Sequence, residues 1–185
     1  MKMKSFLYIL LILIIFLCPA YREYPHFKIN AERDAYNHNN IALNHLHDKA
    51  YYAAIQEFRI AISLSPNTQM TSVFKTNLGK TYMTMGYPDL AKQPFEEALQ
   101  GYKLNFQYYF NLAECYEKLG LIQTKINEYS NSTSPFDKIM LGILYIQSGQ
   151  KRRGIIILDD VCQIEPDLMI TPAIRQYLKE KTKEP

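Results

Sequence analysis

Apolar and small residues recur along this chain in a fixed phrase. The phrase has Leu at its first position, a small residue next to it, Tyr four positions after the Leu, and Gly four positions after the Tyr. The first three of these lie on one stripe of an α-helix, and Gly ends a helix easily because it adopts the left-handed conformation at little cost. The phrase therefore predicts a helix followed by a turn. Its copies are Leu78-Gly79-x-x-Tyr82-x-x-x-Gly86, Leu112-Ala113-x-x-Tyr116-x-x-x-Gly120, Leu141-Gly142-x-x-Tyr145-x-x-x-Gly149 and the weaker Ile41-Ala42-x-x-His45, with Lys49 in the Gly position.

A second apolar phrase follows three of these copies and predicts the partner helix of each pair. It places a small residue, a large apolar residue four positions later and another small or β-branched residue three positions after that. Small residues let two helix backbones approach, and the large residue fills the space between them. The copies are Ala54-x-x-x-Phe58-x-x-Ala61, Ala91-x-x-x-Phe95-x-x-Ala98 and Gly154-x-x-x-Leu158-x-x-Val161, the first and last followed by Pro66 and Pro166. Proline blocks continuation of the helix.

These two phrases, in register over roughly residues 35–166, resemble the tetratricopeptide repeat (TPR) family. The resemblance implies an all-α, right-handed superhelix of about four helix-turn-helix repeats, closed by a C-terminal capping helix. It also implies that the first helix of each repeat lines a concave groove.

The spacing of the phrases predicts unequal repeats. We place the array at 31–166, after a linker at 21–30 and before a capping helix and tail at 167–185. The second helix of the third repeat has Lys125, Tyr129 and Ser132 in the small and large apolar positions, and it runs into a polar stretch that ends at Pro135. We expect this helix to be clipped. The predicted repeats are 31–66, 72–105, 106–134 and 135–166.

The first 20 residues have the layout of an export signal. Two lysines precede an apolar run from Phe6 to Cys18, and small residues lead to Ala20. The run has 13 residues, about 20 Å as a helix, against about 30 Å for a bilayer core. We predict an exported bacterial protein of the periplasm or envelope, soluble after cleavage near Ala20. The alternatives are an uncleaved membrane tether through Phe6–Cys18 and a lipid-modified Cys18.

Charge and motifs exclude several classes of function. Loss of Lys2 and Lys4 with the signal leaves 19 basic and 18 acidic residues, a net charge of +1 that gives no argument for nucleic-acid binding. The sequence has no phosphate-binding glycine loop, nucleophile elbow or zinc-protease motif, and the four histidines lack further ligands at a metal-binding spacing. We therefore expect no enzyme, no cofactor and no metal.

Candidate binding residues follow from the groove that the resemblance implies. An asparagine stands directly before the Leu or Ile of three phrases, and such asparagines resemble the ladder with which some TPR proteins grip a peptide backbone. An amide both donates and accepts hydrogen bonds, so it pairs with any peptide group. The alternative is that these asparagines bond to their own helices. The predicted contact residues are Asn40, Asn77, Asn111, Tyr36, Lys80, Phe110 and Glu114.

The fourth repeat carries a different signal, a row of large apolar residues in the groove positions. An exposed row would mark a partner-binding face. Alternatively, the C-terminal helix packs on it. The row consists of Phe136, Ile139, Ile143 and Ile146.

Three functions are compatible with these features. The first is a non-enzymatic protein-interaction module of the envelope that binds a partner peptide or helix, of unknown identity, in the groove. The second is a fixed structural subunit of a large envelope assembly of the flagellar-motor or secretion type. The third is a regulatory subunit of an exported enzyme. Fixed stoichiometry with a partner would favour the second over the first.

Overall fold

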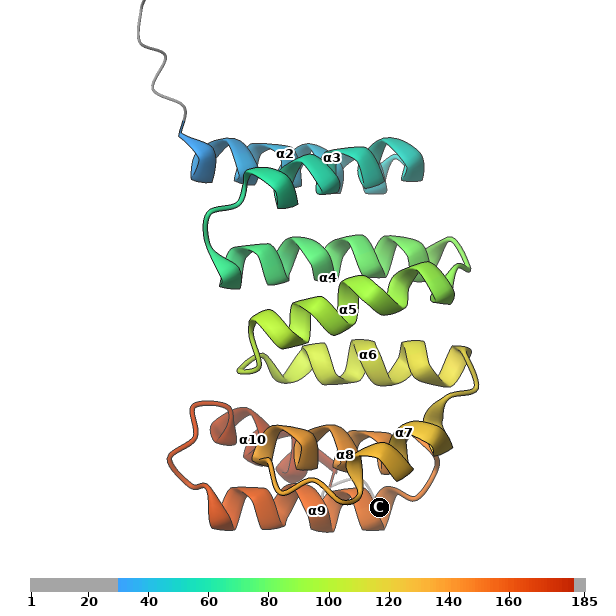
Figure 1. The fold of residues 1–185 in the computed structure, drawn as a ribbon, viewed down its shortest axis with the longest axis vertical. Helices are drawn as coiled ribbons and strands as arrows, with labels where there is room; N and C mark the ends of the chain where they lie inside the picture. The colour runs from blue at the N-terminus through green and yellow to red at the C-terminus, as the bar shows by residue number, and fades with distance from the viewer. Residues whose placement is uncertain (1–29, 182–185) are drawn as a thin grey trace, which may run out of the picture. The chain divides into compact units, whose positions relative to one another are not determined.

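The computed structural model describes residues 30–181. The predicted export signal or anchor (1–20), all but the last residue of the predicted linker (21–30), and residues 182–185 lie outside this part. Within it the chain forms nine α-helices and no strand, so the all-α class is confirmed. The helices are α2 (Ala31–His47), α3 (Tyr51–Leu64), α4 (Thr68–Thr84), α5 (Pro88–Gly101), α6 (Phe106–Lys118), α7 (Ile122–Tyr129), α8 (Pro135–Gln147), α9 (Lys151–Ile164) and α10 (Thr171–Lys181). Successive antiparallel pairs stack one on the next (Figure 1).

The turn inside the second, third and fourth pairs is built by the Gly of the first phrase. Gly86, Gly120 and Gly149 have φ of 81°, 68° and 84°. In the first of these turns the N–H of residue 87 donates to the carbonyl of Tyr82 at 2.9 Å, and the N–H of Gly86 donates to that of Met83 at 3.0 Å. This is the Schellman arrangement, which satisfies the last carbonyls of a helix. The four-residue spacing from Tyr82 to Gly86 in the phrase is therefore the spacing that this helix cap requires.

Small residues fix the approach of the two helices in a pair. A Cβ on Gly79 of α4 would come within 2.6 Å of the Phe95 ring of α5, and one on Gly142 of α8 within 2.8 Å of Leu158 of α9. Phe95 and Leu158 are buried. The large residue of the second phrase therefore packs over the small residue of the first, as the sequence predicts.

The third pair departs from this pattern. Helix α7 has eight residues, whereas α3, α5 and α9 have fourteen each. It packs mainly on α8 and only slightly on α6. The large and small apolar positions hold Tyr129 and Lys125, which cannot close a tight pair, so the clipped helix that we expected is present.

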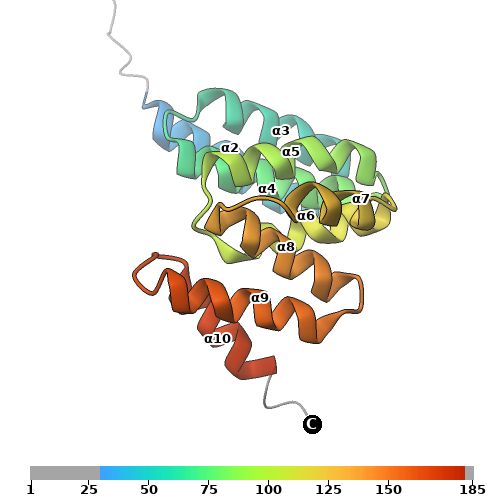
Figure 2. The same ribbon diagram turned by 60° about the horizontal axis from the view of Figure 1, so that its bottom comes forward.

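Helix α10 closes the C-terminal end of the stack, beside α9 (Figures 1 and 2). Ile170, Ile174 and Leu178, spaced by four residues, are buried in the main core. In the same segment, residues 30–181, no helix is long and apolar enough to cross a membrane.

Candidate protein-interaction surface

The first helices of the pairs lie next to one another and form one layer of the stack. Tyr36 of α2 places its ring edge on Phe74 of α4, with 5.9 Å between centroids and 86° between planes. Asn77 of α4 donates a hydrogen bond to the Asn39 side chain of α2 at 3.0 Å. Helix α6 contacts both α4 and α8. The groove positions predicted from the sequence thus belong to helices that are neighbours in space.

The three predicted asparagines do not form a uniform ladder. Asn40, on the first described helix, is exposed. Asn77 occupies the same repeat position but reaches back to α2, where it bonds Asn39. Asn77 therefore bonds to another asparagine of the array, and its side-chain amide is engaged inside the protein.

Asn111 has a third environment. It is 7% exposed, and its side-chain oxygen accepts a hydrogen bond from Gln107 at 3.3 Å. Its amide nitrogen has no protein acceptor. A buried donor without an acceptor is unfavourable by about 1–3 kcal/mol, and because this nitrogen is buried, Asn111 does not present it on the open part of the layer.

The remaining predicted contact residues divide between open and covered parts of the layer. Tyr36 and Lys80 are exposed on α2 and α4. Glu114 of α6 is exposed and lines a pocket of about 530 Å³ with Met83 of α4. Phe110 is half-buried, because Tyr177 of α10 stacks on it at 5.2 Å between ring centroids.

Helix α10 therefore covers part of α6. Tyr177 also meets the ring of Phe106 at 5.6 Å, and Phe106 in turn packs on Phe110 at 5.2 Å. These three rings form an aromatic cluster between α6 and α10. This contact could not be predicted from the sequence, because the repeat phrases do not determine where the last helix turns back.

The predicted apolar face of the fourth repeat is wrong as an exposed surface. Ile139 and Ile143 have no exposed area, and Phe136 and Ile146 are half-buried. Phe136 lies under the ammonium of Lys103, 5.5 Å from its ring centroid. All four pack in the core cluster that also contains Ile174. Burial of Ile139 and Ile143 therefore rules out the row as an exposed partner-binding face.

One part of the layer stays open, and we call it the α2–α4 surface. It consists of groove positions on these two helices that retain exposed side chains: Tyr36, Asn40, Leu43, Val73 and Lys80. The apolar members Tyr36, Leu43 and Val73 are 49%, 42% and 42% exposed.

Acid–base chemistry is not developed at this layer. The clearest pKa shifts belong to side chains buried in the core, two of them on α6. Burial raises the pKa of the Cys115 thiol to about 11. Burial, followed by the hydrogen bond to Glu96, raises the pKa of Tyr116. Among the described residues, no three His, Cys, Asp or Glu side chains come together as metal ligands.

Stacked helix hairpins with these turns and close contacts define a helical repeat protein. Residues 74–100, which cover most of α4 and α5, match the family model of the tetratricopeptide repeat. Residues 74–100 therefore form one tetratricopeptide repeat, and the hairpins stacked on it have the same helix-turn-helix design. No functionally curated protein matches the chain.

Comparison with solved structures finds tetratricopeptide repeat proteins at low identity. A tetratricopeptide repeat protein from Parabacteroides merdae is 18% identical, with a TM-score of 0.50, and the match covers 80% of this chain but only 59% of that protein. MamA is 18% identical over 81% of this chain and 88% of its own, with a TM-score of 0.49. YrrB, described as a TPR protein with an unusual peptide-binding site, is 16% identical over 77% and 74%, with a TM-score of 0.45.

Proposed function

We propose that this protein is a non-enzymatic interaction module that binds a partner peptide or helix on the α2–α4 surface. The observation that carries this proposal is the exposure of Tyr36, Leu43 and Val73 on two adjacent helices. Exposed apolar side chains that lie together mark interaction sites more often than isolated ones do. On α6, by contrast, the aromatic residues Phe106 and Phe110 are already covered by Tyr177 of α10.

The contact between α10 and α6 indicates the kind of partner that this layer accepts. A helix of the chain itself lies against α6 through an aromatic side chain. A partner helix or extended segment with one or two apolar anchors would fit the α2–α4 surface in the same way. Asn40 and Lys80, which are exposed beside the apolar residues, would bind its polar groups.

Site-specific crosslinking in the native host tests the proposal. A photo-reactive amino acid is placed at Leu43 or Val73, and as a matched control at Ile156 of α9, which is also about half exposed. We expect one partner to be captured at both α2–α4 positions and not at Ile156. Its capture at Leu43 should disappear when Tyr36 and Val73 are replaced by Glu in a chain that keeps its helical circular dichroism. Capture that survives this replacement would contradict the proposal.

A fixed structural role in an envelope assembly is the second candidate. A further group of exposed apolar side chains favours it, because Ile156 and Ile164 of α9 and Met169 of the following loop are all exposed. An integral subunit covers such residues permanently. Co-purification in a constant ratio, with crosslinks at Ile156 and Leu43 alike, would select this role.

Export to the bacterial envelope is part of the proposal and rests on residues 1–20 alone. Fractionation of the native host, followed by mass determination of the protein, tests it. Loss of 20 residues with the protein in the periplasm supports cleavage near Ala20. The full mass in the membrane fraction supports an anchor through Phe6–Cys18, and a mass increase at Cys18 supports lipid modification. Recovery in the cytoplasm would contradict export.

A further inference from the structure

A pocket of about 310 Å³ lies between α3, α4 and α5. Its α4 wall is formed by Lys75, Leu78 and Tyr82, which recur at helical spacing on a stripe distinct from Val73 and Lys80 of the α2–α4 surface. The pocket exists because α3 packs on α4 but makes little contact with α5. It therefore belongs to the junction between the first two repeats.

The interior of this pocket is apolar. Leu78 is buried beneath it, and Ile62 of α3, with Leu90 and Pro94 of α5, forms its sides. Leu90 is 50% exposed. An aliphatic side chain that entered here would remove Leu90 and Ile62 from water, which favours binding.

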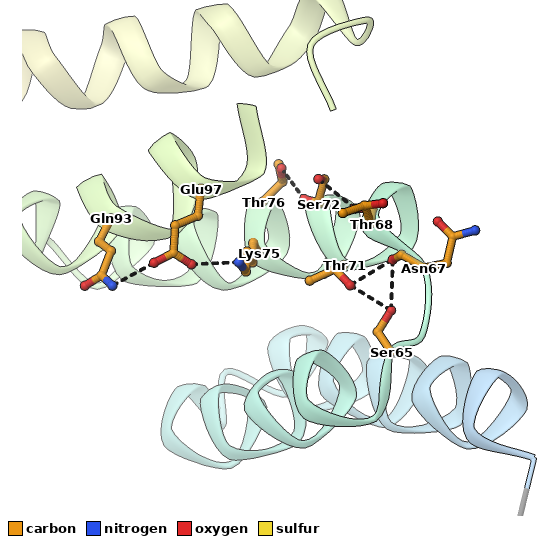
Figure 3. A network of polar contacts seen from close by, with 9 residues as sticks. All are labelled: Ser65, Asn67, Thr68, Thr71, Ser72, Lys75, Thr76, Gln93 and Glu97. Carbon is orange, nitrogen blue, oxygen red and sulfur yellow. Dashed lines mark hydrogen bonds and ion pairs between the residues drawn. The ribbon is translucent and has the colours of Figure 1, made fainter. Parts of the chain in front are cut away.

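The rim carries one balanced ion pair and one unbalanced cation. Lys75 pairs with Glu97 at 2.7 Å, and Glu97 also accepts a hydrogen bond from Gln93 at 2.7 Å (Figure 3). On the other side, the guanidinium of Arg59 donates to the hydroxyl of Tyr82 at 3.0 Å. No carboxylate of residues 30–181 lies within ion-pair distance of Arg59. The rim thus presents one positive charge that lacks a counter-charge.

Proline in the wall adds an acceptor. Pro94 lies inside α5 and has no N–H, so the carbonyl of Leu90, four residues earlier, receives no α-helical hydrogen bond from it. Pro94 is itself a lining residue of the pocket.

We propose that this pocket is a docking site for a partner segment that presents an aliphatic side chain next to a carboxylate. The aliphatic group enters between Ile62 and Leu78, the carboxylate pairs with Arg59, and an N–H of the segment donates to the Leu90 carbonyl. Charge complementarity selects the carboxylate, because Arg59 is the rim cation without a counter-charge. This site is separate from the α2–α4 surface and does not depend on the function proposed for it.

N-acetyl-leucine is the smallest probe that carries all three groups, and methyl-resolved NMR of the isotopically labelled protein reports where it binds. We expect its titration to shift the methyl signals of Ile62, Leu78 and Leu90. N-acetyl-leucinamide, which lacks the charge, should bind about fivefold more weakly, the factor that one partly exposed ion pair supplies.

Variants distinguish the contribution that the Arg59 charge makes to probe binding from the contribution of the pocket's shape. Arg59→Gln should weaken N-acetyl-leucine binding about fivefold, whereas Arg59→Lys should retain most of it. Pro94→Ala, which supplies the missing N–H to the Leu90 carbonyl, should weaken both probes while making the protein more stable. Equal binding of the acid and the amide would overturn the proposal. So would the absence of shifts, or shifts confined to Leu43 and Val73.

Discussion

Replacement of Lys49 by Gly should stabilise the first repeat. Lys49 stands where the other repeats have Gly, and its φ of 59° makes it the single non-glycine residue of positive φ among residues 30–181. Its turn has the same two hydrogen bonds, from residue 50 to His45 at 2.8 Å and from Lys49 to Leu46 at 3.0 Å. The backbone is thus the same in both kinds of turn, and the side chain alone differs.

The expected magnitude follows from two opposing terms. A left-handed conformation is unfavourable for a residue with a Cβ by about 1–2 kcal/mol. Glycine returns about 0.4–1 kcal/mol of this, because it makes the unfolded chain more flexible. Lys49 is exposed and forms no ion pair with the described residues. We therefore expect a net gain of about 0.5–1 kcal/mol, or about 2 °C in Tm for a domain of this size.

Gly120→Ala is the matched control. Its φ is 68°, and a Cβ there would meet no atom within 4 Å, so the substitution changes the backbone preference alone. It should destabilise by a similar amount. Because repeat arrays unfold in parts, amide hydrogen exchange in α2 and α3 should accompany thermal melts. Faster exchange there in Lys49→Gly, or a lower Tm than the unchanged protein, would refute the reasoning.

Three further predictions concern buried groups. Cys115 should react with iodoacetamide at pH 8 on the order of a hundredfold more slowly in the folded protein than after unfolding, because burial raises the pKa of its thiol to about 11. Peptide mass spectrometry follows the reaction, and equal rates in the folded and unfolded protein would contradict this prediction. Gly154→Ala should destabilise by about 2 kcal/mol and more than Gly142→Ala in urea unfolding, because the new Cβ would overlap the Gly142 carbonyl oxygen of the backbone, whereas one on Gly142 first meets side-chain atoms of Leu158. The reverse order would count against this reasoning. Lys75→Met should raise the pKa of Glu97 in an NMR titration, because the hydrogen bond from Lys75 is the main cause that lowers it. The Lys75–Glu97 pair should add under about 1 kcal/mol of stability at its partly exposed position. This stability is present above the pKa that Glu97 has in the unfolded chain, and it is lost as pH falls through the pKa of Glu97 in the folded protein. A difference in stability between the unchanged protein and Lys75→Met that does not depend on pH would refute the assignment.

The sequence predicted the contacts that lie within one repeat. The turn at Gly86 and the packing of Phe95 over Gly79 both depend on residues fewer than twenty positions apart whose spacing is fixed by helix geometry. The same reasoning found the short α7, because Lys125 and Tyr129 visibly break the phrase. Local spacing was sufficient for these features.

Contacts between repeats were not predictable in this way. Asn77 bonds Asn39 rather than lining a free ladder, and Asn111 in the same repeat position is buried with an unpaired donor. These differences depend on how far one hairpin rotates against the next. A repeat phrase carries no information on that rotation, so residues in equivalent positions reach different surroundings.

The short α7 explains why only half of the first-helix layer remains open. Its eight residues span about 12 Å, against about 21 Å for the fourteen of α5, so α7 does not cover α6 as α5 covers α4. Helix α6 instead contacts α8, and its aromatic residues Phe106 and Phe110 meet Tyr177 of α10. Substitutions on α6, α8 and α10 should therefore act through stability, whereas substitutions of Tyr36, Leu43 or Val73 should change partner binding while the fold persists. The division between these two effects is a direct consequence of the helix that the third repeat fails to complete.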